Sequence, residues 1–271
     1  MVSNLLEADV ETVLDEAFAG TDDELLVVDP SAETIVALVE AGVGRDDLPR
    51  IAMLADESVL KSVMNDFLVA SKAADLVAMD ALSIRLLPEA VDNALFVSKA
   101  RAVAIVSAAD QVGALSTIDE AFVRKVYDAH YEAFESAEEY TLRTPPISRV
   151  RETMAADIGE TARDDFDAIL EALDAARGDG DSLDEVTVSL LVAARNDVLL
   201  YDISRWGEDV GIASKATFSR TKTRLEDLGL IDTEKVPIDV GRPRLRLKLG
   251  DDRLVGLDAD GFAEVAVDLA A

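Results

Sequence analysis

The hydrophobic positions of the first 117 residues follow two different spacings. Short apolar runs bounded by polar turn residues predict strands at 25–28, 51–54, 83–87, 95–97 and 103–106. Apolar residues at helical spacing predict helices at 5–18, 31–41 and 56–72. Short apolar strands separated by helices are typical of an α/β layer with a largely parallel sheet. We therefore expect residues 1–117 to form an α/β domain.

From residue 118 the pattern becomes helical. A first helix begins at Asp119 and is broken at Pro145-Pro146. Its expected apolar face comprises Ile118, Phe122, Val126, Ala129, Ala133 and Ala137. A second helix carries an apolar stripe that continues for about seven turns, formed by Ile147, Val150, Met154, Ile158, Ala162, Phe166, Ile169 and Leu173.

A stripe of this length has two interpretations. It pairs with its copy in a homodimer, or it packs on its own sheet. The Gly-rich segment 177–181 follows and is the best sequence signal for a domain boundary. The sequence thus predicts that long helices at 118–178 form a connector and dimerisation region.

Residues 182–271 show the pattern of an α+β winged helix-turn-helix domain. Helical patterns at 184–196 and 201–210 precede Gly211, which permits a tight turn because glycine lacks a Cβ atom. A third helix at 214–228 begins with a serine, a residue that favours the N-cap, and is followed by a glycine.

A two-stranded wing is predicted after the third helix. Its strands occupy 230–235 and 244–249, and the connection contains Gly241 and Pro243, which favour a turn. Arg242 and Arg244 lie in or beside this turn, where a wing contacts the minor groove or the DNA backbone.

The outer face of the predicted third helix carries small and basic residues. Small side chains allow a helix to approach the bases of the major groove, and an arginine can bond to a guanine edge. Flanking cations contact phosphates, which position the protein without specifying sequence. The candidate DNA-binding residues are Lys215, Ala216, Ser219, Arg220, Lys222, Thr223, Arg224, Arg242 and Arg244.

We interpret this domain as a reader of double-stranded DNA. The alternative is a winged helix that docks to proteins of the transcription or repair machinery. A docking helix would present apolar residues on its outer face, whereas this helix presents alanine, serine, arginine and threonine.

The charge of the chain restricts where nucleic acid can bind. The formal net charge is −29, from 55 Asp and Glu against 26 Lys and Arg. Residues 212–253 are locally basic, with ten Lys and Arg against seven Asp and Glu. The acid excess is typical of a protein from a molar-salt cytoplasm, with an acidic mesophilic protein as the alternative. At about 1 M salt the Debye length is about 3 Å, so DNA binding would depend on close contacts.

Several strings of residues along the chain are distinctive. They are Asn4-Leu5-Leu6, Val28-Asp29-Pro30-Ser31, Leu54-Ala55-Asp56-Glu57, Asp66-Phe67-Leu68-Val69-Ala70-Ser71, Phe218-Ser219-Arg220 and Gly241-Arg242-Pro243-Arg244. With these strings nearly the full chain resembles the haloarchaeal transcriptional regulators called TbsP. The resemblance implies a promoter-binding regulator with an N-terminal regulatory domain, linked to control of sugar metabolism genes.

The regulatory domain has candidate effector-binding residues. Open α/β sheets bind ligands beyond the carboxyl ends of their strands, and helix N-termini favour anions. The candidates are Asp29, Ser31, Asp56, Ser58, Lys99 and Arg101. A sugar phosphate is the effector that these groups and the resemblance favour. In the alternative interpretation, the serines only cap helices and the cations pair with surface acids.

No enzyme chemistry is indicated. The chain has no cysteine and a single histidine, His130, and no His pair at ligand spacing, nucleophile elbow or phosphate-binding Gly-rich loop. We therefore expect no catalytic residue, metal or cofactor. The first 20 residues lack a basic start and a continuous apolar stretch, and no run approaches the roughly 18 apolar residues of a membrane span. We expect a soluble cytoplasmic protein without a membrane partner.

Overall fold

The computed structural model describes residues 3–7, 14, 17–18, 23–45, 47–89, 91–108, 111–175, 183–237 and 243–270. The chain forms two compact units, Met1–Pro146 and Ile147–Ala271. The division differs from the predicted one. The helix after Asp119 belongs to the first unit, and the helices after Ile147 belong to the second, so residues 118–178 are shared between the units instead of forming a connector.

The N-terminal unit is built on a seven-stranded mixed sheet in the order β1-β7-β6-β5-β2-β3-β4. The strands are β1 (Ser3–Glu7), β2 (Glu24–Val28), β3 (Arg50–Ala55), β4 (Leu82–Leu86), β5 (Ala94–Val97), β6 (Ala102–Ala108) and β7 (Gln111–Thr117). Only the β2–β3 and β3–β4 pairs are parallel, so the prediction of a largely parallel sheet is wrong. Strand β1 occupies the start of the helix predicted at 5–18, and β7 matches no predicted element.

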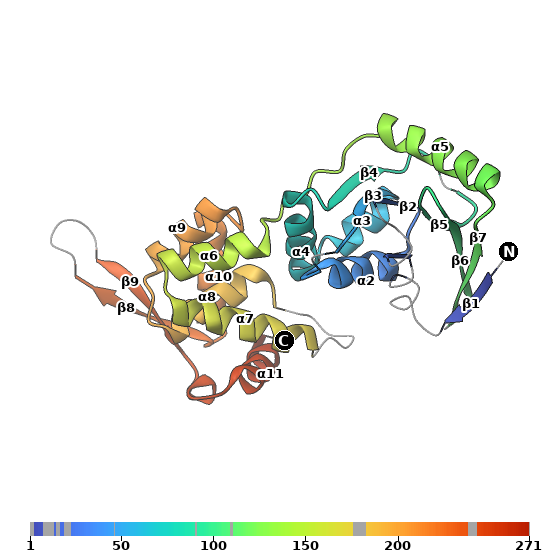
Figure 1. The fold of residues 1–271 in the computed structure, drawn as a ribbon. Helices are drawn as coiled ribbons and strands as arrows, with labels where there is room; N and C mark the ends of the chain where they lie inside the picture. Colours follow the sequence, from blue (N-terminus) through green and yellow to red (C-terminus); the bar gives the residue numbers. More distant parts are fainter. Residues whose placement is uncertain are drawn as a thin grey trace. The chain divides into compact units, whose positions relative to one another are not determined.

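Helices cover both faces of the β2–β3–β4 part of the sheet (Figure 1). On one face lie α2 (Ala32–Gly42), α3 (Glu57–Val63) and α4 (Phe67–Ala78), and on the other lies α5 (Glu120–Ser136). Strand side chains alternate between the two cores, so that Val27 and Met53 face the first and Val28 and Leu54 the second. The single helix predicted at 56–72 is two helices, because Asp66 caps a new start by accepting from two backbone N–H groups.

The buried face of α5 matches the predicted one only in part, since Val126, Ala133 and Ala137 pack against the second core. Val123, Tyr127 and Phe134 are buried, whereas Ile118 and Phe122 are more than half exposed. The predicted face included three alanines, and burying two aromatic rings removes more apolar surface from water. Tyr127 also donates a hydrogen bond to the Glu24 carboxylate at 2.5 Å, which fixes this face toward the sheet.

The C-terminal unit contains six helices and a two-stranded sheet within the described residues. They are α6 (Ile147–Asp157), α7 (Glu160–Ala175), α8 (Glu185–Arg195), α9 (Leu200–Val210), α10 (Lys215–Asp227), β8 (Ile231–Val236), β9 (Arg244–Leu249) and α11 (Ala259–Ala270), with a 3₁₀ turn at Asp252–Leu254. The order is that of the predicted winged helix-turn-helix, with further helices before and after it.

The apolar stripe that begins at Ile147 is largely buried inside this unit. The predicted long helix is broken between α6 and α7, where Gly159 has a φ of +142°. Met154 and Phe166 are fully buried, and α7 packs on α6, α8 and α11. The stripe therefore packs against helices of its own unit, which is not the sheet packing of the alternative interpretation. Because it is buried there, it does not support a homodimer, and formation of a homodimer stays a prediction.

The crossing of α9 and α10 depends on a close contact between Gly207 and Phe218. Phe218 is fully buried, and a Cβ atom placed on Gly207 would overlap the Phe218 ring. The Gly207 carbonyl also accepts from the N–H groups of Gly211 and Ile212, so the same residue holds the turn between the helices. Gly211 itself has a φ of +97°, as the tight turn requires.

We predict that Gly207→Ala destabilises the C-terminal unit by about 1–3 kcal/mol, because the core cannot accept an added methyl group. Fluorescence of Trp206, the only tryptophan and a buried residue of α9, reports on this unit during denaturant unfolding. Phe218→Leu shortens the other side of the contact, so it is combined with Gly207→Ala in a double variant. If the contact is decisive, the double variant loses less stability than the two single losses combined; additive losses would contradict it.

Candidate nucleic-acid interface

The predicted recognition helix lies on the surface of the C-terminal unit. The Ser214 hydroxyl caps α10 by accepting from the Thr217 N–H at 3.2 Å. Phe218 and Leu225 are buried. The face opposite these residues carries the exposed Ala216, Ser219, Arg220 and Thr223. The structure thus brings together the four residues that were predicted to face the bases.

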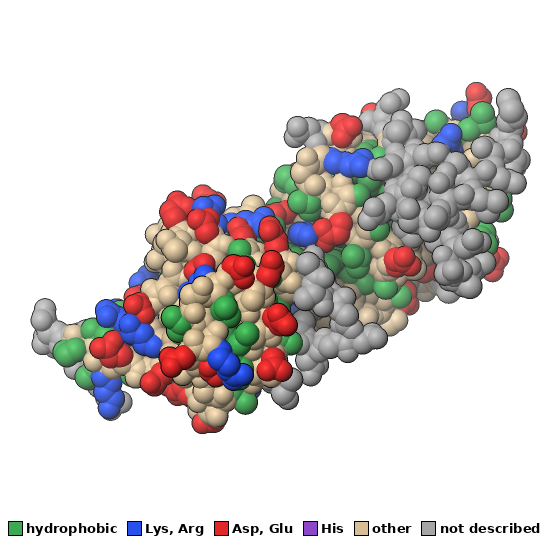
Figure 2. All heavy atoms as spheres, turned by 90° about the horizontal axis from the view of Figure 1, so that it is seen from below, with side chains coloured by type: hydrophobic (Ala, Val, Ile, Leu, Met, Phe, Trp, Pro, Cys, Tyr) green, Lys and Arg blue, Asp and Glu red, His purple; other side chains and the backbone are tan. Residues whose placement is uncertain are grey.

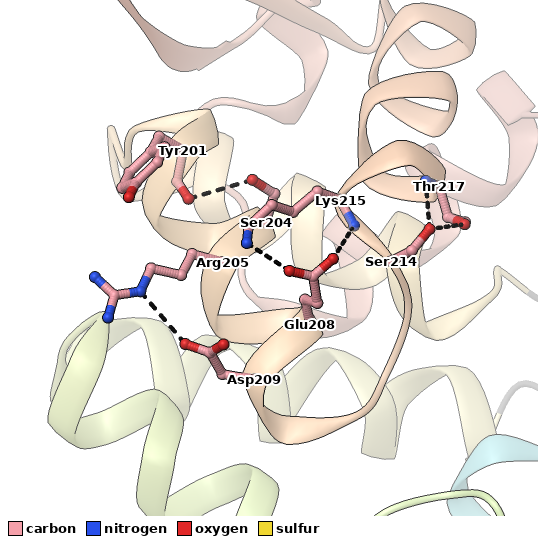
Figure 3. A network of polar contacts seen from close by, with 8 residues as sticks. All are labelled: Tyr201, Ser204, Arg205, Glu208, Asp209, Ser214, Lys215 and Thr217. Carbon is pink, nitrogen blue, oxygen red and sulfur yellow. Dashed lines mark hydrogen bonds and ion pairs between the residues drawn. The ribbon is translucent and has the colours of Figure 1, made fainter.

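Lys215, at the start of α10, is already paired with a carboxylate of α9 (Figure 3). Its Nζ lies 2.5 Å from Glu208 Oε2, and its backbone N–H donates to Glu208 Oε1 at 3.3 Å. These hydrogen bonds hold the pKa of Glu208 below its usual value and the pKa of Lys215 above its usual value. Both groups therefore stay charged at neutral pH.

Lys222 was predicted to contact phosphate, but in the structure its ammonium group is engaged in a largely buried ion pair. Its side chain is only 12% exposed, and Nζ is 2.6 Å from Glu226 Oε2. The other oxygen of Glu226 accepts from the Thr233 hydroxyl at 2.9 Å. This chain of contacts ties α10 to β8, so Lys222 serves to position the helix.

Arg224 also fixes α10, in this case to the start of α8. One guanidinium nitrogen donates to the Thr187 hydroxyl at 3.0 Å and lies 3.8 Å from Asp184. The side chain remains largely exposed, so a phosphate can still approach it. Arg220 differs from these cations, because its contact is with the Thr217 hydroxyl at 3.4 Å and it has no carboxylate partner among the described residues.

Arg244 lies at the loop end of the wing, in the last strand pair before the connecting loop. It is the first residue of β9 and pairs with Val236 across the hairpin. Its guanidinium lies 4.3 Å from the centre of the Tyr201 ring and 3.6 Å from Asp202, so it is held against α9. Tyr201 was missed by the sequence reasoning, because nothing in a sequence pairs it with a residue 43 positions later. Arg242 lies outside the described residues.

Opposite charges are interleaved over this unit. Residues 183–271 contain 12 Lys and Arg against 17 Asp and Glu, a formal charge of −5. On the face drawn in Figure 2, the Lys and Arg side chains of this unit lie beside Asp and Glu side chains. The interface is therefore not a basic patch, and its recognition chemistry has to come from particular side chains.

The six predicted effector residues do not form one site. Asp29 and Asp56 follow the carboxyl ends of β2 and β3, where Ser31 and Asp56 cap helices. Strand β5 runs antiparallel to β2, so the turn with Lys99 and Arg101 lies beyond the opposite end of the sheet. Lys99 instead lines a hollow of about 630 Å³ with Asp23, Glu24, Arg50, Tyr127 and Tyr131. The prediction of a shared anion site is wrong because it assumed parallel strands.

The described part of the chain also bears on metal binding and membrane spans. There, no group of three or more His, Asp or Glu side chains is arranged to hold a metal ion. None of the helices in these ranges is both long enough and apolar enough to span a bilayer. His130 is partly buried on α5, and burial lowers its pKa.

Family models match both units of the chain. The model described as TbsP-like transcriptional regulator, N-terminal, matches residues 2–145, and the model of the TbsP-like C-terminal HTH domain matches residues 146–267. The chain belongs to the TbsP-like family of transcriptional regulators. In this TbsP-like regulator the boundary between the two family models coincides with the structural division after Pro146.

More distant likenesses are weak. No curated protein sequence matches this TbsP-like regulator. The archaeal chromatin protein TrmBL2, described with a novel mode of DNA binding, aligns at 16% identity over 51% of this chain and 54% of its own, with a TM-score of 0.38. The phospholipase D family member Nuc from Salmonella typhimurium aligns at 9% identity over 52% of this chain and 96% of its own, with a TM-score of 0.36. Neither likeness is close enough to assign a fold or an activity.

We predict that Lys222→Ala lowers the unfolding free energy by about 1–3 kcal/mol, because it leaves the half-buried Glu226 carboxylate without its cation. Lys215→Ala is the matched control, since its pair with Glu208 is far more exposed and contributes little. Denaturant unfolding followed by Trp206 fluorescence distinguishes the two variants. Equal losses for both would contradict a positioning role for Lys222.

Proposed function

We propose that this TbsP-like regulator binds promoter DNA in a sequence-specific manner by placing α10 in the major groove. The observation that carries the proposal is the exposed face of Ala216, Ser219, Arg220 and Thr223, whose opposite side is fixed by Phe218. A face of small and polar residues on a rigid helix fits a groove that presents hydrogen-bond donors and acceptors.

Arg220 has the main role in reading bases. It is exposed, and among the described residues its side chain contacts a neutral hydroxyl and no carboxylate, so a guanine edge does not have to compete with a carboxylate for it. Ser219 is exposed beside it and can bond to a base or a phosphate. The Thr223 hydroxyl donates to the Ser219 carbonyl at 3.1 Å, which leaves its methyl group and lone pairs for the groove.

The remaining cations would position the protein on the backbone. Lys215 and Arg224 flank the recognition face and remain partly or largely exposed, as phosphate contacts require. Arg244 at the loop end of the wing would contact the backbone next to the groove, and Arg242 is our candidate for the wing tip. A protein-docking role for this helix is not favoured, because the exposed face lacks large apolar side chains.

The genes under control are proposed from the family resemblance. It points to genes of sugar metabolism, with a phosphorylated sugar as the effector. Genome-wide immunoprecipitation of the regulator, in cells grown with and without sugar, would identify the promoters and test this part of the proposal separately from DNA binding itself.

We predict that Arg220→Ala weakens binding to a promoter fragment that the wild-type protein binds. The expected loss is about 1–3 kcal/mol, on the order of 10- to 100-fold, and it persists in high salt. The loss persists because a guanine contact is a close hydrogen bond and not a screened long-range attraction. Arg149→Ala, which removes an exposed arginine from α6, is the control of equal charge. Gel-shift titrations with equal affinity for wild type and Arg220→Ala would refute the assignment of α10.

A further inference from the structure

Three cations around the recognition helix are paired with acidic side chains. Lys215, Arg224 and Arg244 each have a carboxylate of the same unit within 4 Å. The Lys215 pair with Glu208 is the tightest of these, and it joins the end of α9 to the start of α10 (Figure 3). It is also nearly half exposed, with 46% of the lysine and 43% of the glutamate side chain open to solvent.

We propose that Glu208 remains ionised beside the DNA backbone when this regulator binds, and that the complex takes up about one monovalent cation there. The proposal rests on the function proposed above. Its consequence is a dependence of DNA affinity on salt that is less steep than the number of phosphate contacts predicts.

Glu208 is held in place by two hydrogen bonds from one residue. The ammonium group and the backbone N–H of Lys215 bind its two carboxylate oxygens. Because the backbone N–H belongs to the first turn of α10, the carboxylate stays at this helix terminus even if the lysine side chain swings toward a phosphate. The lowered pKa of Glu208 has the same cause, so protonation does not remove the charge at neutral pH.

A phosphate that approaches Lys215 creates an imbalance of charge. If the lysine stays paired, one ammonium group is shared by a carboxylate and a phosphate. If the lysine moves to the phosphate, the carboxylate is left beside the DNA without its cation. In both cases one negative charge remains uncompensated, since the neighbouring Asp209 is already paired with Arg205 at 3.4 Å. A cation from solution lowers this repulsion.

The salt dependence follows from counting ions. Each neutralised phosphate of duplex DNA releases about 0.9 counterion, which makes affinity fall as salt rises. A cation that is taken up at Glu208 cancels about one of those released. The carboxylate thus lowers the affinity for DNA at low salt and makes that affinity fall less as the salt concentration rises.

The test compares Glu208→Gln with Glu264→Gln in the full chain. Glutamine keeps an acceptor for the Lys215 N–H but removes the charge, and Glu264 is an exposed residue of α11 that gives the same change of net charge elsewhere. Affinity for a promoter fragment is measured over a series of KCl concentrations. We expect Glu208→Gln to bind more tightly at low salt and to steepen the slope of log K against log[KCl] by about one, while Glu264→Gln leaves the slope unchanged.

Lys215→Met in the two backgrounds provides a second measurement. If Lys215 is paired with Glu208, removing the lysine changes the slope of log K against log[KCl] only a little in the wild type. In Glu208→Gln the lysine is free to bind a phosphate, so removing it lowers the number of counterions released from DNA by about one. Trp206 fluorescence confirms that all variants are folded. Equal slopes for wild type and Glu208→Gln, with DNA binding still dependent on Arg220, would overturn this inference alone. If the folded full-length protein binds no promoter fragment at any salt, both the inference and the proposed function fail.

Discussion

Repulsion between an acidic protein and a polyanion is the constraint on which this DNA-binding unit depends. Residues 183–271 carry a formal charge of −5 within a chain of −29, so long-range attraction does not bring this surface to a phosphate backbone. Binding has to be organised by contacts that act only at close range. This fits the recognition face that we propose, with alanine, serine and threonine around Arg220, where the polar groups would act by hydrogen bonding and fit more than by charge.

Close-range recognition requires a helix whose position is fixed, and several charged residues of α10 serve this purpose. Phe218 packs where Gly207 leaves space, which sets the crossing of α9 and α10. Lys222 connects α10 to β8 through Glu226, and Arg224 connects it to α8 through Thr187. Part of the positive charge of α10 thus forms contacts within the protein. These contacts fix the helix that carries the proposed recognition face.

The sequence predicted the winged helix-turn-helix well, because its signals are local. Ser214 and Gly211 mark a cap and a turn within a few residues of their effects, and the strand predicted at 244–249 is β9. The N-terminal sheet was predicted less well, because alternating apolar residues identify a strand but not its direction. The antiparallel course of β5 therefore placed Lys99 away from Asp29. Ion pairs between elements, such as Lys215 with Glu208, have no sequence signal at all.

Because ion pairs between elements have no sequence signal, the number of basic residues in a segment does not give the number of DNA contacts. Of the nine Lys and Arg that the structure describes between residues 212 and 253, six have a carboxylate within 4 Å: Lys215, Lys222, Arg224, Arg244, Lys248 and Arg253. A count of cations treats them as equivalent, but a paired cation can meet a phosphate only by sharing or leaving its partner. Sharing leaves an excess negative charge, and leaving exposes the carboxylate, so each pair reduces the net number of ions that DNA binding releases. In an acidic regulator the partners of the basic residues therefore determine the response to salt as much as the basic residues do.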